Sequence, residues 1–371
     1  MLWGIASPAA ATREAPVDPA IPIVLLVDVS SGQTLYARAP DRRFVPASVT
    51  KVMTAYTAFE LFKQGKISPE QSFVFSDSAA EKWQRTGSTM FLEAGDEASV
   101  DQLLMAITTV SANDGSIALA EGAAGSVAGW VTMMNANASA LGMRQSQFGT
   151  PNGWPDDGRT FTTARDLVRL GRALVTEHPR RFAQYFGHRG LVTNGVAQDN
   201  HEPLTGRVEG ADGIKTGYTN QAGYTFLGTA KRGGRRLLLV LAGAPDERMR
   251  DRSARAMIEW GFNAFDVKPL FSTAEMVARA QVQDGNLPAV PLLAENPIHV
   301  AIPTDARSRV TLAIRYEGPL RAPVKMGEQV AQLQINVDGM PPSLIPLVAG
   351  EDVEKAGFFR RIANAFAGLF A

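Results

Sequence analysis

The spacing of hydrophobic residues changes several times along the chain, and each change predicts a different element. Residues 21–29 form an almost continuous apolar run, which is typical of a buried strand. Residues 34–39 follow a Ser-Ser-Gly-Gln turn and are predicted to return as a second strand. From Val49 to about Gly65 apolar residues recur at helical spacing, so the sequence predicts a helix next.

Helices are predicted to fill the middle of residues 20–266, with strands at both ends. Ser99 suits an N-cap, because Val100, Leu103 and Ile107 after it share one helical face. The other elements expected in this region are helices at Ile117–Ala120, 130–141, 164–176 and 249–265, and strands at 213–230 and 236–243.

The pattern changes again near residue 267. Short alternating stretches, separated by Pro and Gly, predict a small all-β domain over residues 267–350. Residues 351–371 carry bulky apolar side chains at helical spacing together with Arg360 and Arg361. Such an amphipathic helix suits a membrane interface, and it equally suits docking on the β domain.

The N-terminal residues 1–19 are expected to be a residual signal peptide or a disordered tail. Residues 1–11 are apolar, and small residues at Ala9 and Ala11 suit a signal-peptidase site, but a positively charged start is missing. No stretch reaches the roughly 18–20 apolar residues that a transmembrane helix needs.

Composition narrows the classes of function. The 371 residues favour two domains. Lys plus Arg and Asp plus Glu both number 37, so bulk charge gives no reason to expect a nucleic-acid partner. The absence of cysteine excludes a thiol nucleophile, disulfides and thiolate metal sites. We expect neither a cofactor nor a metal.

The first candidate chemistry is Ser48-Val49-Thr50-Lys51. Residues three apart on a helix share a face, so Ser48 and Lys51 are predicted to lie together near the start of the helix. A helix start favours a developing oxyanion. The tetrapeptide is common, however, and alone it more often describes an N-cap serine beside a solvated lysine.

Two later motifs add to it. Ser111-Ala112-Asn113 falls in a break between two predicted helices, at residues 111–115, and Lys215-Thr216-Gly217 falls on a predicted strand. In this order and context the three motifs resemble those of penicillin-binding proteins and serine β-lactamases. With Asp114, residues 118–121 and residues 212–214, they most resemble the low-molecular-mass D-alanyl-D-alanine carboxypeptidases of peptidase family S11.

The resemblance implies a fold. We expect an α/β (α+β) transpeptidase domain of the penicillin-binding-protein and serine β-lactamase type over residues 20–266, with an antiparallel sheet and a helical cluster. The β domain of residues 267–350 and the amphipathic helix of residues 351–371 match the layout of the family. By resemblance, the protein is periplasmic, and this helix anchors it to the surface of the inner membrane.

A serine hydroxyl needs a base within hydrogen-bond reach. The histidines lie outside all three motifs and are predicted to be structural or on the surface: His178, His188, His201 and His299. Lys51 can serve instead if burial and the nearby charge of Lys215 lower its pKa until it is neutral.

The resemblance assigns roles to the acylating residues. Ser48 attacks the carbonyl of D-Ala-D-Ala, and Lys51 takes its proton. Ser111 relays a proton to the leaving D-alanine. Asn113 holds Lys51 and binds the substrate amide. The backbone N–H groups of Ser48 and Tyr218 form the oxyanion hole.

The resemblance also assigns substrate-binding residues. Lys215 and Thr216 attract the terminal carboxylate, and Gly217 leaves room for the substrate to lie along the strand. Tyr218 stands where many relatives carry histidine, which puts a side-chain role in doubt. Arg248 or Arg250 lies where the family places an arginine near the substrate carboxylate; a solvated helix charge is the alternative.

The expected activity is removal of the terminal D-alanine from peptidoglycan stem pentapeptides, in cell-wall biogenesis and cell-shape control, with β-lactams as covalent inhibitors. A class A β-lactamase is less favoured, because residues 150–167 lack a deacylating glutamate in a Glu-x-x-Leu-Asn loop. A binding protein that has lost turnover is the non-enzymatic hypothesis. Within the enzyme class, endopeptidase action on cross-links stays open, because the acyl half of both substrates is similar.

Overall fold

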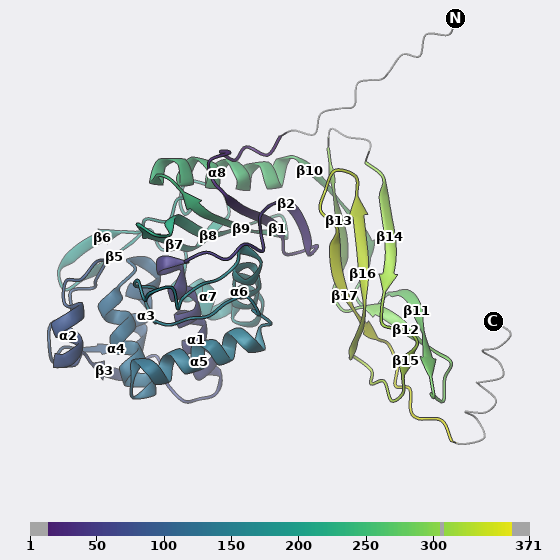
Figure 1. Ribbon diagram of the computed structural model, residues 1–371, viewed down its shortest axis with the longest axis horizontal. Helices are drawn as coiled ribbons and strands as arrows, with labels where there is room; N and C mark the ends of the chain where they lie inside the picture. The colour runs from purple at the N-terminus through teal and green to yellow at the C-terminus, as the bar shows by residue number, and fades with distance from the viewer. Residues whose placement is uncertain (1–13, 305–307, 358–371) are drawn as a thin grey trace, which may run out of the picture. The chain divides into compact units, whose positions relative to one another are not determined.

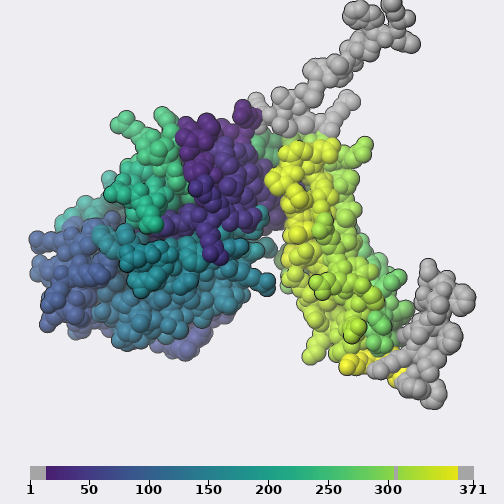
Figure 2. All heavy atoms as spheres, in the orientation of Figure 1, coloured from purple at the N-terminus to yellow at the C-terminus, as the bar shows by residue number. Residues whose placement is uncertain are grey.

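The computed structural model describes residues 14–304 and 308–357. Its contacts divide the chain into two compact units. The larger unit comprises Ala15–Val27 and Tyr36–Phe262, and the smaller one includes Asp28–Leu35 and the chain from Asn263 onward. Figures 1 and 2 show both units, and each is described by itself below.

The larger unit is built on a five-stranded sheet with the strand order β2-β1-β9-β8-β7. β7 is therefore an edge strand, and β7–β8 and β8–β9 pair antiparallel. The strands are β1 (Ile23–Asp28), β2 (Gln33–Arg38), β7 (Ala211–Thr219), β8 (Gly223–Arg232) and β9 (Arg235–Ala244).

Helices cover both faces of this sheet. Successive residues of a strand point to opposite faces, and Leu237 and Leu238 of β9 show the result. Leu237 packs on Gly261 of α8, whereas Leu238 packs on Gly171 of α6. Accordingly, α8 lies on one side of the sheet in Figure 1 and the other helices gather on the opposite side. In Figure 2 the blue and teal atoms of this helical cluster form one mass beside the sheet.

The helices of the larger unit are α1 (Lys51–Lys63), α2 (Asp77–Trp83), α3 (Val100–Thr109), α4 (Asn113–Ala124), α5 (Val127–Ala140), α6 (Ala164–Glu177), α7 (Pro179–Tyr185) and α8 (Glu247–Asn263). The predicted N-cap of α3 is confirmed. Ser99 accepts a hydrogen bond from Gln102 N, and the Gln102 side chain accepts one from Ser99 N, which is a complete capping box.

Two sequence predictions for this unit are wrong. Residues 213–230 form two strands rather than one, because the chain turns between Thr219 and Gly223, where Gly223 adopts a φ of +64° that favours glycine. The helix expected from Ile117 begins earlier, at Asn113, and this places Asn113 in its first turn. Two hairpins were not predicted: β3 (Ser72–Val74) with β4 (Glu97–Ser99), and β5 (Gly190–Thr193) with β6 (Val196–Asp199).

The smaller unit is all-β, as predicted. Its six-stranded sheet has the order β14-β16-β17-β12-β11-β15, and β10 pairs with β13. The strands are β10 (Phe265–Phe271), β11 (Met276–Gln283), β12 (Ala289–Ala294), β13 (Ile298–Pro303), β14 (Val310–Arg315), β15 (Leu320–Arg321), β16 (Gln329–Val337) and β17 (Ser343–Ala349). Leu292, Leu333 and Leu347 lie in its buried core.

The turn between β1 and β2 belongs to the smaller unit. The Gln33 side chain accepts a hydrogen bond from the backbone of Ala301, and Ser343 Oγ accepts one from Thr34 N at 3.2 Å. These buried polar contacts explain why residues 28–35 group with a domain that follows more than two hundred residues later in the sequence.

The predicted C-terminal helix does not begin at residue 351. Val353 is fully buried and forms a bridge with Val324, and Lys355 bridges to Gly285, so residues 351–357 complete the β unit in extended conformation. The rest of the predicted helix, residues 358–371, lies outside the described residues, as do residues 1–13 of the predicted N-terminal tail.

Within the described ranges, no single helix is long and apolar enough to cross a membrane. α4 and α5 reach that length and composition only together, and they are bent by 88°.

Candidate active site

Ser48 lies on a short 3₁₀ turn, Ala47–Thr50, and α1 begins only at Lys51. The sequence predicted both residues on one α-helix, so this detail is corrected. The predicted juxtaposition is nevertheless present, because Lys51 Nζ lies 3.0 Å from Ser48 Oγ. The turn is shaped by Ala47, whose φ of +50° is unusual for a residue with a side chain. Gly153 allows this shape, since a Cβ there would lie 1.9 Å from the Ala47 carbonyl oxygen.

Lys51 is buried and has three hydrogen-bond partners. Besides Ser48 Oγ, its Nζ contacts Asn113 Oδ1 at 2.8 Å and the Asn152 carbonyl oxygen at 2.7 Å. The Asn113 amide is oriented by its Nδ2, which donates to the Thr86 carbonyl at 2.9 Å, so Oδ1 faces the lysine. Both amide oxygens can only accept. A neutral Lys51 therefore donates its two N–H groups to them and turns its lone pair toward the Ser48 hydroxyl.

The electrostatic surroundings favour this neutral form. Burial, and to a smaller extent the charge of Lys215, lower the pKa of Lys51 well below its ordinary value, while Asp114 opposes the shift. The Asp114 carboxylate is bound by backbone N–H groups. It accepts these bonds from Met90, Leu92 and Gly115. Asp114 thus ties the loop before β4 to the start of α4.

Ser111 lies in the break between α3 and α4, where the sequence predicted it. Its φ is +66°, a left-handed conformation that costs energy for a residue other than glycine and occurs preferentially at functional sites. Ser111 is buried, two residues before Asn113. Within the described residues its hydroxyl makes no hydrogen bond to Ser48 or Lys51.

β7 passes close to the turn that carries Ser48. A Cβ at Gly217 would lie 2.6 Å from the Pro46 carbonyl oxygen and 3.0 Å from Ser48 N. Thr225 of β8 closes this contact, because its hydroxyl lies 3.0 Å from the Pro46 carbonyl and 3.1 Å from the Gly217 carbonyl. The room beside Gly217 is therefore taken by the nucleophile's own turn. The sequence prediction that this glycine makes room for substrate is corrected: it lets β7 approach Ser48.

Lys215 and Thr216 of β7 are buried beside this turn. Lys215 Nζ donates to the Thr216 carbonyl at 3.1 Å. Burial and the charge of Arg250 lower the pKa of Lys215 to about 7, while Glu202 raises it. The pKa of the Lys215 ammonium thus depends on Arg250 and Glu202, which come from other segments of the chain.

Arg250 of α8 is buried, with 2% of its surface exposed, so the alternative of a solvated helix charge is excluded. Its Nη2 lies 3.0 Å from Glu247 and 2.7 Å from Asp251, and it donates to the His201 carbonyl at 3.4 Å. Arg248 is exposed. Arg250 reaches the site through its charge on Lys215, and its guanidinium lies 5.9 Å from the centre of the Tyr224 ring.

The Tyr218 side chain is half-exposed, at 51%. Its hydroxyl donates to Asn220 at 2.9 Å, and its ring lies 4.3 Å from that of Tyr224. The side chain therefore points along the surface. Because β7 is an edge strand, its outward backbone N–H and C=O groups are free of a neighbouring strand.

Three residues that contribute to the site lie outside the sequence motifs and were not predicted. Asn152 supplies a carbonyl to Lys51, Gly153 accommodates Ala47, and the buried carboxylate of Glu202 acts on Lys215. Asn152 and Gly153 stand in a loop whose Pro-Asn-Gly sequence signals only a turn. Glu202 gives no sequence signal, because its importance depends on burial.

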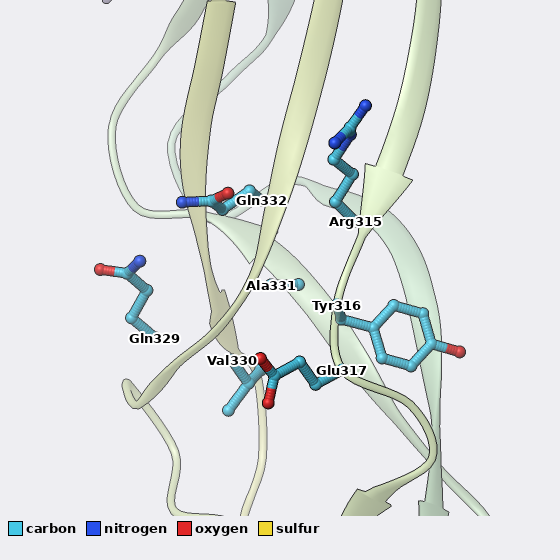
Figure 3. Close-up of a pocket in the computed structure, with 7 residues that line it drawn as sticks. All are labelled: Arg315, Tyr316, Glu317, Gln329, Val330, Ala331 and Gln332. Carbon is cyan, nitrogen blue, oxygen red and sulfur yellow. The ribbon is translucent and has the colours of Figure 1, made fainter. Parts of the chain in front are cut away.

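A separate hollow of about 390 Å³ lies on the smaller unit (Figure 3). It sits between the end of β14 and the start of β16, where Arg315 is paired with Gln332. Figure 3 shows Tyr316 directed away from β16 and the Glu317 carboxylate near Val330. Its lining residues do not include serine, histidine or cysteine.

Comparison with known proteins agrees with the class that this site defines, a serine hydrolase with a lysine base. Residues 10–246 match the family Peptidase_S11, D-alanyl-D-alanine carboxypeptidase, and residues 265–355 match the C-terminal domain of penicillin-binding protein 5. The first match covers more than half of the chain. The chain belongs to the S11 family of serine-type D-alanyl-D-alanine carboxypeptidases.

Alignments with individual relatives cover most of the chain. The D-alanyl-D-alanine carboxypeptidase DacC of Escherichia coli K12 is 33% identical over 347 residues, which cover 91% of this chain and 85% of DacC. DacF of Bacillus subtilis is 29% identical and covers 90% of this chain and 86% of its own length. The crystal structure of penicillin binding protein 5 from Haemophilus influenzae, at 29% identity, superposes with a TM-score of 0.76 over 92% of this chain and 99% of its own. These likenesses support the predicted α+β penicillin-binding-protein fold with its all-β C-terminal domain.

Proposed function

We propose that this protein removes the terminal D-alanine from peptidoglycan stem pentapeptides through an acyl-enzyme on Ser48, in cell-wall biogenesis and cell-shape control. The observation that carries the proposal is the geometry at Lys51. Its Nζ lies 3.0 Å from Ser48 Oγ, and its other two partners, Asn113 Oδ1 and the Asn152 carbonyl, can only accept, so a neutral Lys51 can turn its lone pair to the Ser48 hydroxyl. This is a serine nucleophile with its base in place.

In the first step Lys51 takes the Ser48 proton as Oγ attacks the carbonyl carbon of the penultimate D-alanine. The backbone N–H groups of Ser48 and Tyr218 receive the oxyanion, which is supported by the close approach of β7, since a Cβ at Gly217 would lie 3.0 Å from Ser48 N. Lys215 and Thr216 bind the terminal carboxylate. Ser111 relays the proton from Lys51 to the nitrogen of the leaving D-alanine as the peptide C–N bond breaks, and water then hydrolyses the ester and restores the Ser48 hydroxyl.

β-Lactams are proposed to acylate Ser48 by the same route. Support comes from Penicillin-Binding Protein D2 of Listeria monocytogenes, solved in its ampicillin-bound form, which is 28% identical and superposes with a TM-score of 0.60 over 66% of this chain. Since a β-lactam carries a carboxylate beside its reactive carbonyl, Lys215 is expected to bind it as it binds the substrate.

The test is mass spectrometry of a stem pentapeptide incubated with the protein and with Ser48→Ala. We expect loss of one alanine with the unsubstituted protein only. Intact-mass analysis with penicillin should show one adduct per chain, and none on Ser48→Ala. An untouched pentapeptide together with an unlabelled Ser48 would overturn the proposal. A cross-linked stem dimer in the same assay measures endopeptidase action.

We also propose a periplasmic location, with the chain held at the inner membrane by the sequence after Gly357. The support is the aromatic and basic composition of residues 358–371. Truncation after Gly357 preserves the bridges of Val353 and Lys355 in the β unit. It should move the protein from the membrane fraction to the soluble fraction while penicillin labelling persists. An unchanged membrane fraction would contradict the anchor.

A further inference from the structure

A cluster of metal-ligating side chains lies away from Ser48, where the C-terminal half of α1 meets the junction of α6 and α7. Glu60 comes from α1, Glu177 is the last residue of α6, and His178 follows it directly. One ligand atom of each residue lies within 4.8 Å of the others. Among the described residues this is the single group of His, Asp or Glu with such spacing.

The central contact of the cluster is incomplete. His178 Nε2 lies 2.8 Å from Glu60 Oε1, which is an ion-pair distance. Both atoms are nevertheless buried without a hydrogen bond, because the ring N–H does not point at the oxygen. His178 is only 7% exposed, so water does not readily replace the missing partner. In the neutral tautomer with the proton on Nδ1, the Nε2 lone pair points past Glu60 Oε1, and a cation on that side can be ligated by both atoms.

The surrounding side chains hold these ligands in place. The His178 ring packs edge-on against Tyr56 and Phe59, at centroid distances of 5.3 and 5.7 Å. The Tyr56 hydroxyl donates to Glu177 Oε2 at 3.0 Å, which leaves the other carboxylate oxygen for a ligand. Such an outer hydrogen bond to a ligating carboxylate is a regular feature of metal sites.

Charge also favours a cation here. Two carboxylates converge on one histidine, and the Lys63 ammonium, 3.6 Å from Glu60 Oε1, has a largely exposed side chain that water screens.

We propose that Glu60, Glu177 and His178 form a Zn²⁺ site that joins α1 to the α6–α7 junction. Zinc takes imidazole nitrogen and carboxylate oxygen as ligands in tetrahedral sites, so one imidazole and two carboxylate oxygens would leave the fourth position to water. Ca²⁺ and Mg²⁺ are disfavoured, because they select oxygen ligands. The site would brace the helix whose first residue is the base Lys51, and it goes beyond the hydrolase activity.

The test is zinc binding by the full chain after chelator treatment and dialysis. We expect one Zn²⁺ per chain by equilibrium dialysis, a saturable rise in the thermal unfolding temperature, and an anomalous zinc peak at His178 Nε2 in crystals. His178→Gln should lower the affinity at least about 100-fold, and Tyr56→Phe about 10-fold through loss of the outer hydrogen bond. His188→Gln, which changes a half-buried histidine outside the cluster, is the matched control and should bind as the unsubstituted chain does.

Either of two results would overturn the proposal. One is the absence of stoichiometric zinc on the unsubstituted chain, which would leave His178 and Glu60 as an ion pair. The other is binding that persists in His178→Gln with an anomalous peak elsewhere. If His178→Gln fails to fold, the dialysis and the anomalous peak of the unsubstituted chain still decide the question.

Discussion

The two halves of the active site are held in different ways. The acylation half, defined as Ser48, Lys51, Asn113 and Asn152, is fixed by hydrogen bonds at 2.7–3.0 Å to one lysine nitrogen. The carboxylate half is defined as Lys215, Glu202 and Arg250. Among the described residues, the Lys215 ammonium has one hydrogen bond, to the carbonyl of its neighbour Thr216, and burial together with the charges of Arg250 and Glu202 sets its pKa. The acylation half thus depends on the positions of its hydrogen-bond partners, whereas the carboxylate half depends on the charges near Lys215.

This difference follows from the task of each half. A base must present its lone pair in one direction, so Lys51 needs fixed acceptors on its other sides. A group that attracts a carboxylate needs positive charge and space, and a full set of hydrogen bonds would compete with the substrate. Substitutions in the acylation half should therefore lower the reaction rate at every pH. Substitutions in the carboxylate half should change how the rate depends on pH.

The largest effect is expected from Lys51→Met, which removes the base. Acylation of Ser48 by penicillin should slow by about a thousand- to ten-thousand-fold, in the upper part of the range for general-base catalysis. Stopped-flow acylation rates measure this. Lys66→Met, at an exposed lysine just after the same helix, is the control and should change the rate little. A loss below ten-fold for Lys51→Met would show that another group takes the proton.

Lys215→Gln should act on both halves. Loss of the carboxylate partner should lower kcat/KM about 100-fold. In addition, the charge of Lys215 lowers the pKa of Lys51, so its removal raises that pKa. Because Lys51 must be neutral to accept a proton, the acidic limb of the kcat/KM profile should move to higher pH. Lys231→Gln, an exposed position on β8, should leave this limb in place. An unmoved limb in Lys215→Gln would mean that the two lysines are not coupled.

Glu202→Gln should change mainly the pH dependence. Glu202 raises the pKa of Lys215, so removing its charge lowers that pKa below the present value of about 7. Lys215 then loses its proton at lower pH, and the basic limb of kcat/KM should move down. The Glu202 carboxylate also accepts backbone N–H bonds from Leu204 and Thr205, so a stability loss of about 1–3 kcal/mol is expected as well.

The stability loss alone would not move a pH limb, which makes the pH profile the deciding measurement. Glu209→Gln, an exposed glutamate in the segment that leads to β7, is the matched control. A Glu202→Gln profile that superposes on the control profile would assign Glu202 a purely structural role.

The smallest effect is expected from Tyr218→Phe. The Tyr218 hydroxyl bonds only to exposed Asn220, and the proposed contribution of this residue is its backbone N–H. Acylation rates should stay within about two-fold, since a surface hydrogen bond contributes little. A ten-fold loss would show that the phenol participates in the reaction.

The sequence predicted the acylation half better than the carboxylate half, and the reason is physical. Ser48 and Lys51 are neighbours on one turn, so local spacing was enough to bring them together. The pKa of Lys215 depends on Glu202 and Arg250, which come from other segments of the chain. The effect of these charges depends on burial, and a local sequence pattern does not show which side chains are buried. Asn152 was missed because its backbone carbonyl, rather than its side chain, contacts Lys51.

Fold prediction failed where tertiary contacts override local pattern. The prediction of residues 213–230 as one strand missed the turn at 220–222, which joins two strands that pair antiparallel. Residues 28–35 have the pattern of an ordinary hairpin turn, yet Gln33 and Thr34 bond to residues far along the chain. The start of α4 at Asn113 follows from contacts to Thr86 and Ser88, which no helical periodicity records.

The central claim is that Lys51 is neutral while it faces Ser48. The most direct test is a pH titration of lysine side chains by NMR in protein labelled at the lysine ε-carbon, with the Lys51 signal identified by its absence in Lys51→Met. The account predicts a Lys51 titration well below the ordinary value of 10.5. A Lys51 signal that titrates near 10.5 would contradict it.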